Sequence, residues 1–132
     1  MSKAKTIDIE VRWGDLDAFN HVNNTVFLRF VEESRIQFFD ELVEDWDNID
    51  EGPVVVNINC NFRGEIRYPA TVRIKVEARV ASEKRLVMVH TLTDRDNPER
   101  LYADAEVTAV WVSKSAGQSV PIPDAVRDAL SS

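Results

Sequence analysis

The chain has 132 residues, of which 44% are hydrophobic and 30% are charged, and its formal net charge is −7. This length and composition predict one compact domain over residues 1–132. An acidic chain without a basic cluster would repel a phosphate backbone, so nucleic acid is not an expected partner.

The sequence also bears on the compartment. Its first residues, MSKAKTIDIE, lack the apolar run of a signal peptide, and no stretch reaches the ~20 apolar residues that cross a bilayer. The single cysteine, Cys60, cannot form an internal disulfide. We therefore expect a cytoplasmic protein without a membrane partner.

The first predicted elements are a strand, a loop and a long helix. Residues 6–12 alternate apolar and polar side chains, which is typical of a half-buried strand. Residues 13–24, WGDLDAFNHVNN, favour turns and a helix N-cap. From residue 25 to about residue 44, apolar and small side chains recur every three or four positions and predict one helical face: Val26, Phe27, Phe30, Val31, Ser34, Phe38 and Leu42.

The remaining pattern predicts a sheet. After an acidic turn at residues 44–53, the period changes to two, and strands are expected at residues 54–62, 72–80, 85–93 and 101–112. Short polar turns between them predict an antiparallel meander, with Cys60 as a small core residue. A short helix is expected after Pro123. The fold class is therefore α+β, an antiparallel sheet wrapped around one long helix, with a partly solvated outer face.

Two carboxylates precede the long helix, at Asp15 and Asp17. The N-terminus of a helix has unpaired amide donors and a partial positive charge, which can stabilise an oxyanion. A nearby carboxylate could then act as a nucleophile or a base. Taken alone, Asp17 would be interpreted first as a helix N-cap or a turn-stabilising carboxylate.

The segment from residue 12 to residue 35 resembles the signature of the 4-hydroxybenzoyl-CoA thioesterase group of hot-dog-fold acyl-CoA thioesterases. The matching positions are Arg12, Trp13, Asp15, Asp17, His21, Val22, Asn23, Asn24, Phe27, Glu33 and Arg35. The resemblance extends over residues 5–113 and implies a hot-dog fold and hydrolysis of an acyl-CoA thioester.

The resemblance also implies roles for individual residues. Asp17 would be the catalytic base or nucleophile, the backbone amide of Asn24 would contact the thioester oxygen, and His21 would position the water or Asp17. We expect Asp15 to brace the loop. Asn20 stands where the family commonly has Gly, and Asn tolerates the left-handed backbone that such a turn needs.

The sequence departs from the family at a second position, and it has basic residues that could bind CoA. Phe27 stands where the family often has Tyr, and the missing hydroxyl makes a polar acyl group less expected. Lys84 and Arg85 are candidates for contacts with the phosphates of CoA, and Arg63 is a weaker one. Because CoA is part of the substrate, no separate cofactor is expected.

Several side chains have plain structural interpretations. Two distant histidines and one cysteine do not make a metal site, so none is expected. His90 is expected to be a half-buried strand residue. Glu33 and Arg35 lie two positions apart and should not form a salt bridge with each other.

The family implies a homodimer or homotetramer with active sites at the dimer interface. An acidic surface favours free CoA esters over an acidic carrier protein. Two other functions stay open on the sequence alone: a non-catalytic acyl-CoA-binding or regulatory module, and a dehydratase that acts on 3-hydroxyacyl thioesters.

Overall fold

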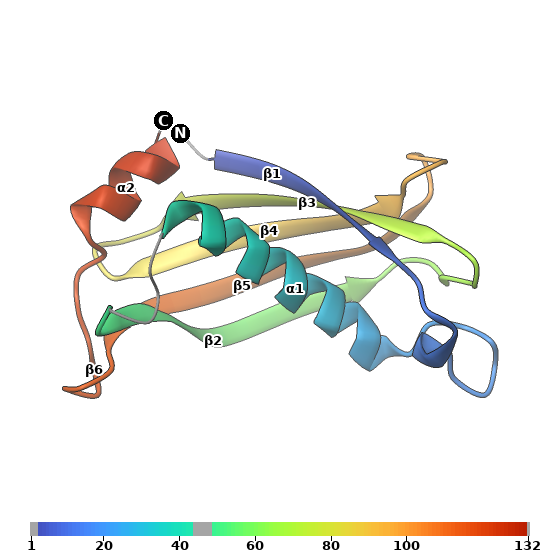
Figure 1. Ribbon diagram of the computed structural model, residues 1–132, viewed down its shortest axis with the longest axis horizontal. Helices are drawn as coiled ribbons and strands as arrows, with labels where there is room; N and C mark the ends of the chain where they lie inside the picture. Colours follow the sequence, from blue (N-terminus) through green and yellow to red (C-terminus); the bar gives the residue numbers. More distant parts are fainter. Residues whose placement is uncertain (1–2, 44–48, 132) are drawn as a thin grey trace.

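A computed structural model describes residues 3–43 and 49–131 (Figure 1). Its elements are β1 (Lys3–Glu10), η1 (Trp13–Asp15), α1 (Asn24–Leu42), β2 (Glu51–Phe62), β3 (Thr71–Val80), β4 (Arg85–Asp94), β5 (Leu101–Ser113), β6 (Gln118–Ser119) and α2 (Asp124–Ser131). The predicted α+β class is confirmed. Residues 44–48, which include the end of the predicted helix and half of the predicted acidic turn, lie outside the described residues. Strand β2 already begins at Glu51, within the predicted turn.

The order of strands in the sheet is β1-β3-β4-β5-β2, with the short β6 beside β5, and every pairing is antiparallel. The predicted four-strand meander is therefore wrong in one respect. Strands β3, β4 and β5 do form a meander, but β2 pairs with β5 and not with β3. The alternation of side chains identifies a strand but not its neighbour, which is why the sequence did not reveal this crossover.

The connection between β2 and β3, residues 63–70, makes the crossover possible. The amides of Arg63 and Gly64 both donate to the carbonyl of Tyr102, at 2.9 and 3.0 Å. A Cβ atom on Gly64 would lie 3.0 Å from the carbonyl oxygen of Leu101, so glycine permits this close approach. Ile66 is fully buried and anchors the connection in the core.

Helix α1 lies across one face of the sheet (Figure 1). Its buried residues are Phe27, Phe30, Val31, Ser34, Phe38 and Phe39. In β3 the predicted alternation is confirmed, because Val72, Ile74, Val76 and Ala78 are fully buried while the residues between them are partly or fully exposed. The short helix α2 is also confirmed, and it contacts β1 and β3. No helix in residues 3–43 and 49–131 is long and apolar enough to span a membrane.

His90 is buried more deeply than expected. It has no exposed surface, and its Nδ1 lies 3.2 Å from the hydroxyl of Ser34 on α1. The Ser34 hydroxyl donates its one hydrogen to the carbonyl of Val31, at 2.8 Å. Nδ1 must therefore carry the ring hydrogen, and Nε2 is left as a buried acceptor without a partner in the described part of the chain. Burial, and then the charge of Arg35, lower the pKa of His90 to about 4.

The edge strand β2 departs most from its pattern. A β-bulge between Val55 and Asn57 shifts the register, so one alternation does not run through the whole strand. Val55 before the bulge and Cys60 after it pack against the core. Four other apolar side chains are 44–53% exposed instead of buried: Val54, Val56, Ile58 and Phe62.

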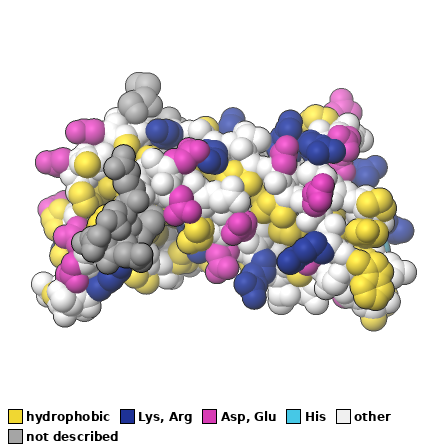
Figure 2. Space-filling model, in the orientation of Figure 1, with side chains coloured by type: hydrophobic (Ala, Val, Ile, Leu, Met, Phe, Trp, Pro, Cys, Tyr) yellow, Lys and Arg dark blue, Asp and Glu magenta, His cyan; other side chains and the backbone are white. Residues whose placement is uncertain are grey.

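The surface shows two further features. Acidic and basic side chains are interspersed on the face in Figure 2, and hydrophobic ones gather at the end that carries the loop before α1. In that loop, Trp13 and Phe19 are 76% and 78% exposed. On helix α1, Glu33 accepts a hydrogen bond from Gln37 at 3.1 Å.

Candidate active site

The loop before α1 is braced by Asp15. This side chain is buried, and its carboxylate accepts from the backbone amide of Arg12 at 2.8 Å and from the guanidinium of Arg12 at 3.0 Å. The carbonyl of Asp15 accepts from the amide of Asn23 at 3.0 Å. Asp15 thus connects both ends of the loop, and the interpretation of Asp15 as a structural residue agrees with these contacts.

Asp17 lies at the start of a tight turn within this loop. Its amide donates to the carbonyl of His21 at 2.8 Å, and its Oδ1 accepts from the amides of Phe19 and His21 at 2.8 and 3.3 Å. Asn20 has a φ of 62°, the left-handed conformation expected from its place in the motif. In residues 3–43 and 49–131, Oδ2 of Asp17 has no hydrogen-bond partner, so one carboxylate oxygen is fixed and the other is free.

The N-terminus of α1 supplies a free amide beside this carboxylate. Asn23 is the N-cap, and its side chain accepts from the amide of Thr25 at 2.9 Å. The amides of Val26 and Phe27 donate to the carbonyl of Asn23. The amide of Asn24 has no acceptor among the described residues, so it is available to an oxyanion.

One pocket of about 300 Å³ brings these groups together, and it is lined by Asp17, His21, Val22, Asn24, Phe27, Phe62, Arg63, Gly64 and Glu65. Four of the six predicted site residues are in this set. The rings of Phe27 and Phe62 pack edge to face with centroids 5.2 Å apart and form an apolar wall. A charged rim beside an apolar wall suits a thioester, whose acyl group is apolar and whose carbonyl becomes anionic on attack.

Lys84 and Arg85 lie elsewhere. Phe62 pairs with Ala103 on β5, whereas Arg85 pairs with Val110, seven residues further along the same strand. Seven residues span about 23 Å in an extended strand. Within one chain, the two basic residues are therefore at the opposite end of the sheet from Asp17, and the ammonium of Lys84 donates a hydrogen bond to the hydroxyl of Ser119 at 3.5 Å.

Glu65 lines the pocket but was not predicted. Its Oε2 lies 3.1 Å from Nε2 of His21 and 3.4 Å from the guanidinium of Arg67. No motif marks this position, because it reaches the site through the connection between β2 and β3. Arg63, in the same connection, pairs with Asp104 at 2.8 Å, and this hydrogen bond lowers the pKa of Asp104 and raises that of Arg63.

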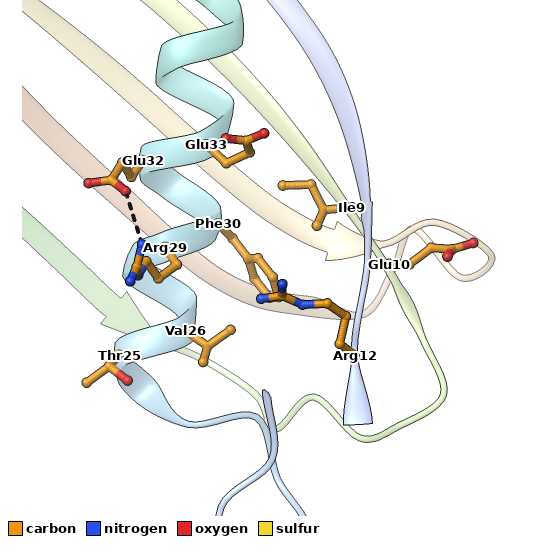
Figure 3. Close-up of a pocket in the computed structure, with 9 residues that line it drawn as sticks. All are labelled: Ile9, Glu10, Arg12, Thr25, Val26, Arg29, Phe30, Glu32 and Glu33. Atoms are coloured by element: carbon orange, nitrogen blue, oxygen red, sulfur yellow. Dashed lines mark ion pairs between the residues drawn. The ribbon is translucent and has the colours of Figure 1, made fainter. Parts of the chain in front are cut away.

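A larger groove of about 700 Å³ lies on the other side of α1, between that helix and β1 (Figure 3). Ile9 and Phe30 point into it, while Arg29 and Glu32 form an ion pair at 3.8 Å on its rim. It contains none of the predicted site residues and has no free carboxylate beside a free helix amide. The smaller pocket is therefore the better candidate for chemistry.

Known proteins resemble the chain over most of its length. The model of the Thioesterase-like superfamily matches residues 11–130. The solved structure of PA2801 from Pseudomonas aeruginosa, a proposed thioesterase, is 35% identical, with 94% of this chain and 95% of that chain covered and a TM-score of 0.87. The long-chain acyl-CoA thioesterase FadM of Escherichia coli (strain K12) is 27% identical, covering 92% of this chain and 93% of FadM. The uncharacterized protein YsmA of Bacillus subtilis (strain 168) is 28% identical, and the match covers 92% of this chain and 82% of YsmA. The architecture and these matches confirm the predicted hot-dog fold.

Proposed function

Because the chain belongs to the thioesterase-like superfamily and is therefore a thioester hydrolase, we propose that it cleaves an acyl-CoA ester in the pocket of Asp17, His21 and Asn24. One observation carries this proposal. The free carboxylate oxygen of Asp17 and the free amide of Asn24 line the same pocket at the start of α1. A base or nucleophile and an oxyanion donor are the two groups that acyl transfer requires.

Two routes use these groups. With Asp17 as a base, the carboxylate takes a proton from water while the water oxygen attacks the carbonyl carbon, and the Asn24 amide holds the oxyanion. The C–S bond then breaks, and the departing thiolate receives the proton, so the free acid and CoA leave. With Asp17 as a nucleophile, the carboxylate attacks the carbonyl carbon, the thiolate leaves, and water hydrolyses the anhydride.

The CoA moiety would use basic side chains. Arg63 lies on the rim of the pocket and is the candidate from the same chain. Lys84 and Arg85 can serve this pocket only from a second subunit, because one chain keeps them at the far end of the sheet. We assign no further cofactor, since CoA enters as part of the substrate, and we place the reaction in the cytoplasm.

A homodimer, or a tetramer of two such dimers, fits the exposed edge of the sheet. Strand β2 is an edge strand with unpaired backbone groups and four exposed apolar side chains, and its last residue, Phe62, lines the pocket. Pairing of β2 with β2 of a second copy would cover these side chains and complete the pocket wall. Sedimentation velocity tests this, because a monomer at micromolar concentration would contradict it.

The test of function is release of free thiol from short, long, branched and aromatic acyl-CoAs. We expect Asp17→Asn to fold normally and to lose at least about 10³-fold in kcat, since the amide is neither a base nor a comparable nucleophile. Asp128→Asn, an exposed carboxylate on α2, is the matched control and should retain full activity. Equal turnover by wild type and Asp17→Asn would contradict the assignment of Asp17.

A further inference from the structure

Among the described residues, Glu65 is the side chain that forms an ion pair with the ring of His21. The distance from its Oε2 to Nε2 of His21 is 3.1 Å. Because a carboxylate only accepts, Nε2 must carry a hydrogen. The contact therefore fixes which nitrogen is protonated in the neutral ring, and Nδ1 becomes the nitrogen available to water or substrate.

The backbone holds the two side chains against each other. The amide of Val22, the residue after His21, donates to the carbonyl of Ile66, the residue after Glu65, at 2.8 Å. Ile66 is fully buried, and Gly64 is tied to β5 through Tyr102 at 3.0 Å. Although the Glu65 side chain is 59% exposed, the chain on both sides of it is fixed.

His21 is in turn connected to Asp17. Its carbonyl accepts from the amide of Asp17 at 2.8 Å, and its own amide donates to Oδ1 of Asp17 at 3.3 Å. A displacement of His21 would therefore move the catalytic carboxylate. The series Glu65, His21, Asp17 is continuous through direct contacts.

A second charged side chain, Arg67, also contacts the carboxylate of Glu65. Arg67 lies 3.4 Å from Oε2 of Glu65 and competes with His21 for it. Arg63, the remaining charged group of the pocket, pairs with Asp104 instead. Glu65 is thus the acidic side chain of the pocket that faces the ring of His21, while Asp17 meets the backbone of the histidine.

We infer that Glu65 is a positioning residue of this active site: it orients the His21 ring so that Nδ1 faces the reacting groups, and it keeps the Asp17 turn in place. This inference rests on the proposed function for its kinetic consequence, but its structural part can be observed without substrate. At metal sites, removing a carboxylate that orients a histidine commonly lowers affinity or activity by about tenfold or more, and we expect a loss of similar size here.

The chain offers an internal reference for the structural part. It has two histidines, and the contacts assign them opposite neutral forms: hydrogen on Nε2 in His21, and hydrogen on Nδ1 in His90. The ¹⁵N chemical shifts of the two rings should therefore show opposite patterns. His90 then serves as an unchanged standard in every variant of Glu65.

The experiment compares Glu65→Ala and Glu65→Gln with wild type and with Glu106→Ala, which removes an exposed glutamate from β5. In Glu65→Ala, we expect the ¹⁵N shifts of the neutral His21 ring to move toward the averaged values of free imidazole, and kcat to fall about tenfold with KM little changed. Glu65→Gln retains a neutral acceptor, so it should preserve the His21 pattern and stay within about threefold of the wild-type kcat. Glu106→Ala should change neither quantity.

The outcomes separate this inference from the proposed function. Unchanged His21 shifts and unchanged kcat in Glu65→Ala, with Asp17→Asn inactive, would overturn the role of Glu65 and leave the function standing. Turnover that survives in Asp17→Asn would instead reject the assigned catalytic carboxylate, while the ring shifts would still report the contact of Glu65. A large loss of thermal stability in Glu65→Ala, with the His90 shifts displaced as well, would show a role in folding and would also overturn the inference.

Discussion

The two histidines of the chain lie in opposite surroundings. His21 is at the rim of an open pocket and forms an ion pair with a carboxylate that is 59% exposed. His90 is fully buried, and its hydrogen-bond partner in the described chain is the neutral hydroxyl of Ser34 on α1. Each ring uses one nitrogen for its contact. The His21 side chain lines a pocket, while the remaining nitrogen of His90 has no partner in the described chain.

The difference separates activity from stability. A ring beside solvent and a free carboxylate can exchange protons and take part in chemistry. A ring inside an apolar core can only stay neutral, because charging it would place an unpaired cation in the interior. We therefore expect changes near His21 to alter turnover and changes near His90 to alter the free energy of unfolding.

The largest expected effect is on the pH dependence of stability. In the folded state burial holds the pKa of His90 at about 4, and the ordinary value is 6.5. Between these values the unfolded chain binds a proton that the folded chain does not, so the free energy of unfolding should decrease as the pH falls from 6.5 to 4. The difference between the two pKa values corresponds to a decrease of about 3 kcal/mol in the free energy of unfolding.

Urea denaturation at steps across this window checks the effect, with His90→Gln as the control. The variant lacks the titrating group, so its stability should vary much less between pH 6.5 and pH 4, whatever its stability at neutral pH. Carboxylates do not account for this window. Salt bridges or hydrogen bonds lower the pKa values of Asp8, Asp94 and Asp104 in the folded state, so their contributions are lost only at more acidic pH. An equally steep dependence in His90→Gln would contradict the assignment.

A smaller loss of stability is expected from Ser34→Ala. The hydroxyl of Ser34 is the acceptor for Nδ1–H of His90, and both residues are fully buried. Removing it leaves a second buried ring nitrogen without a partner, which costs about 2 kcal/mol. Urea denaturation at neutral pH measures the change, and Ser82→Ala, in an exposed turn, is the matched control. Turnover per folded molecule should be the same as in wild type. A loss of turnover without a loss of stability would contradict the expectation that changes near His90 alter the free energy of unfolding and not the activity.

The parts of the fold that sequence could predict are those that depend on local periodicity. The alternation in β3 and the helical spacing in α1 are set by which side chains must be buried, and both are confirmed. The place of β2 beside β5 depends on a crossover held by contacts to Tyr102, and its exposed side chains depend on a bulge at Val56. The spacing of apolar residues along the sequence predicts neither the pairing of β2 with β5 nor the exposure of these side chains.

The site shows the same limit. Asp17, His21 and Asn24 lie within eight residues of one another, so a single loop and helix start bring them together. Glu65 enters through tertiary contacts of the β2–β3 connection, and nothing in its neighbourhood in the sequence marks it. The full burial of His90 was also missed, because a lone polar residue in a strand does not reveal which face the helix covers.

The smallest expected effect is a change in KM on substitution of Arg63, which lines the same pocket as His21. Its guanidinium is exposed and shared with Asp104 at 2.8 Å, so a phosphate of CoA must compete with that carboxylate. We expect Arg63→Gln to raise KM for an acyl-CoA about threefold with kcat unchanged, and this difference should shrink as salt is added. Asp104→Asn removes the competitor and should lower KM instead, which gives a matched variant of opposite sign. Steady-state kinetics at low and high ionic strength measure both, and a change of KM in the same direction in both variants would show that Arg63 does not contact the substrate.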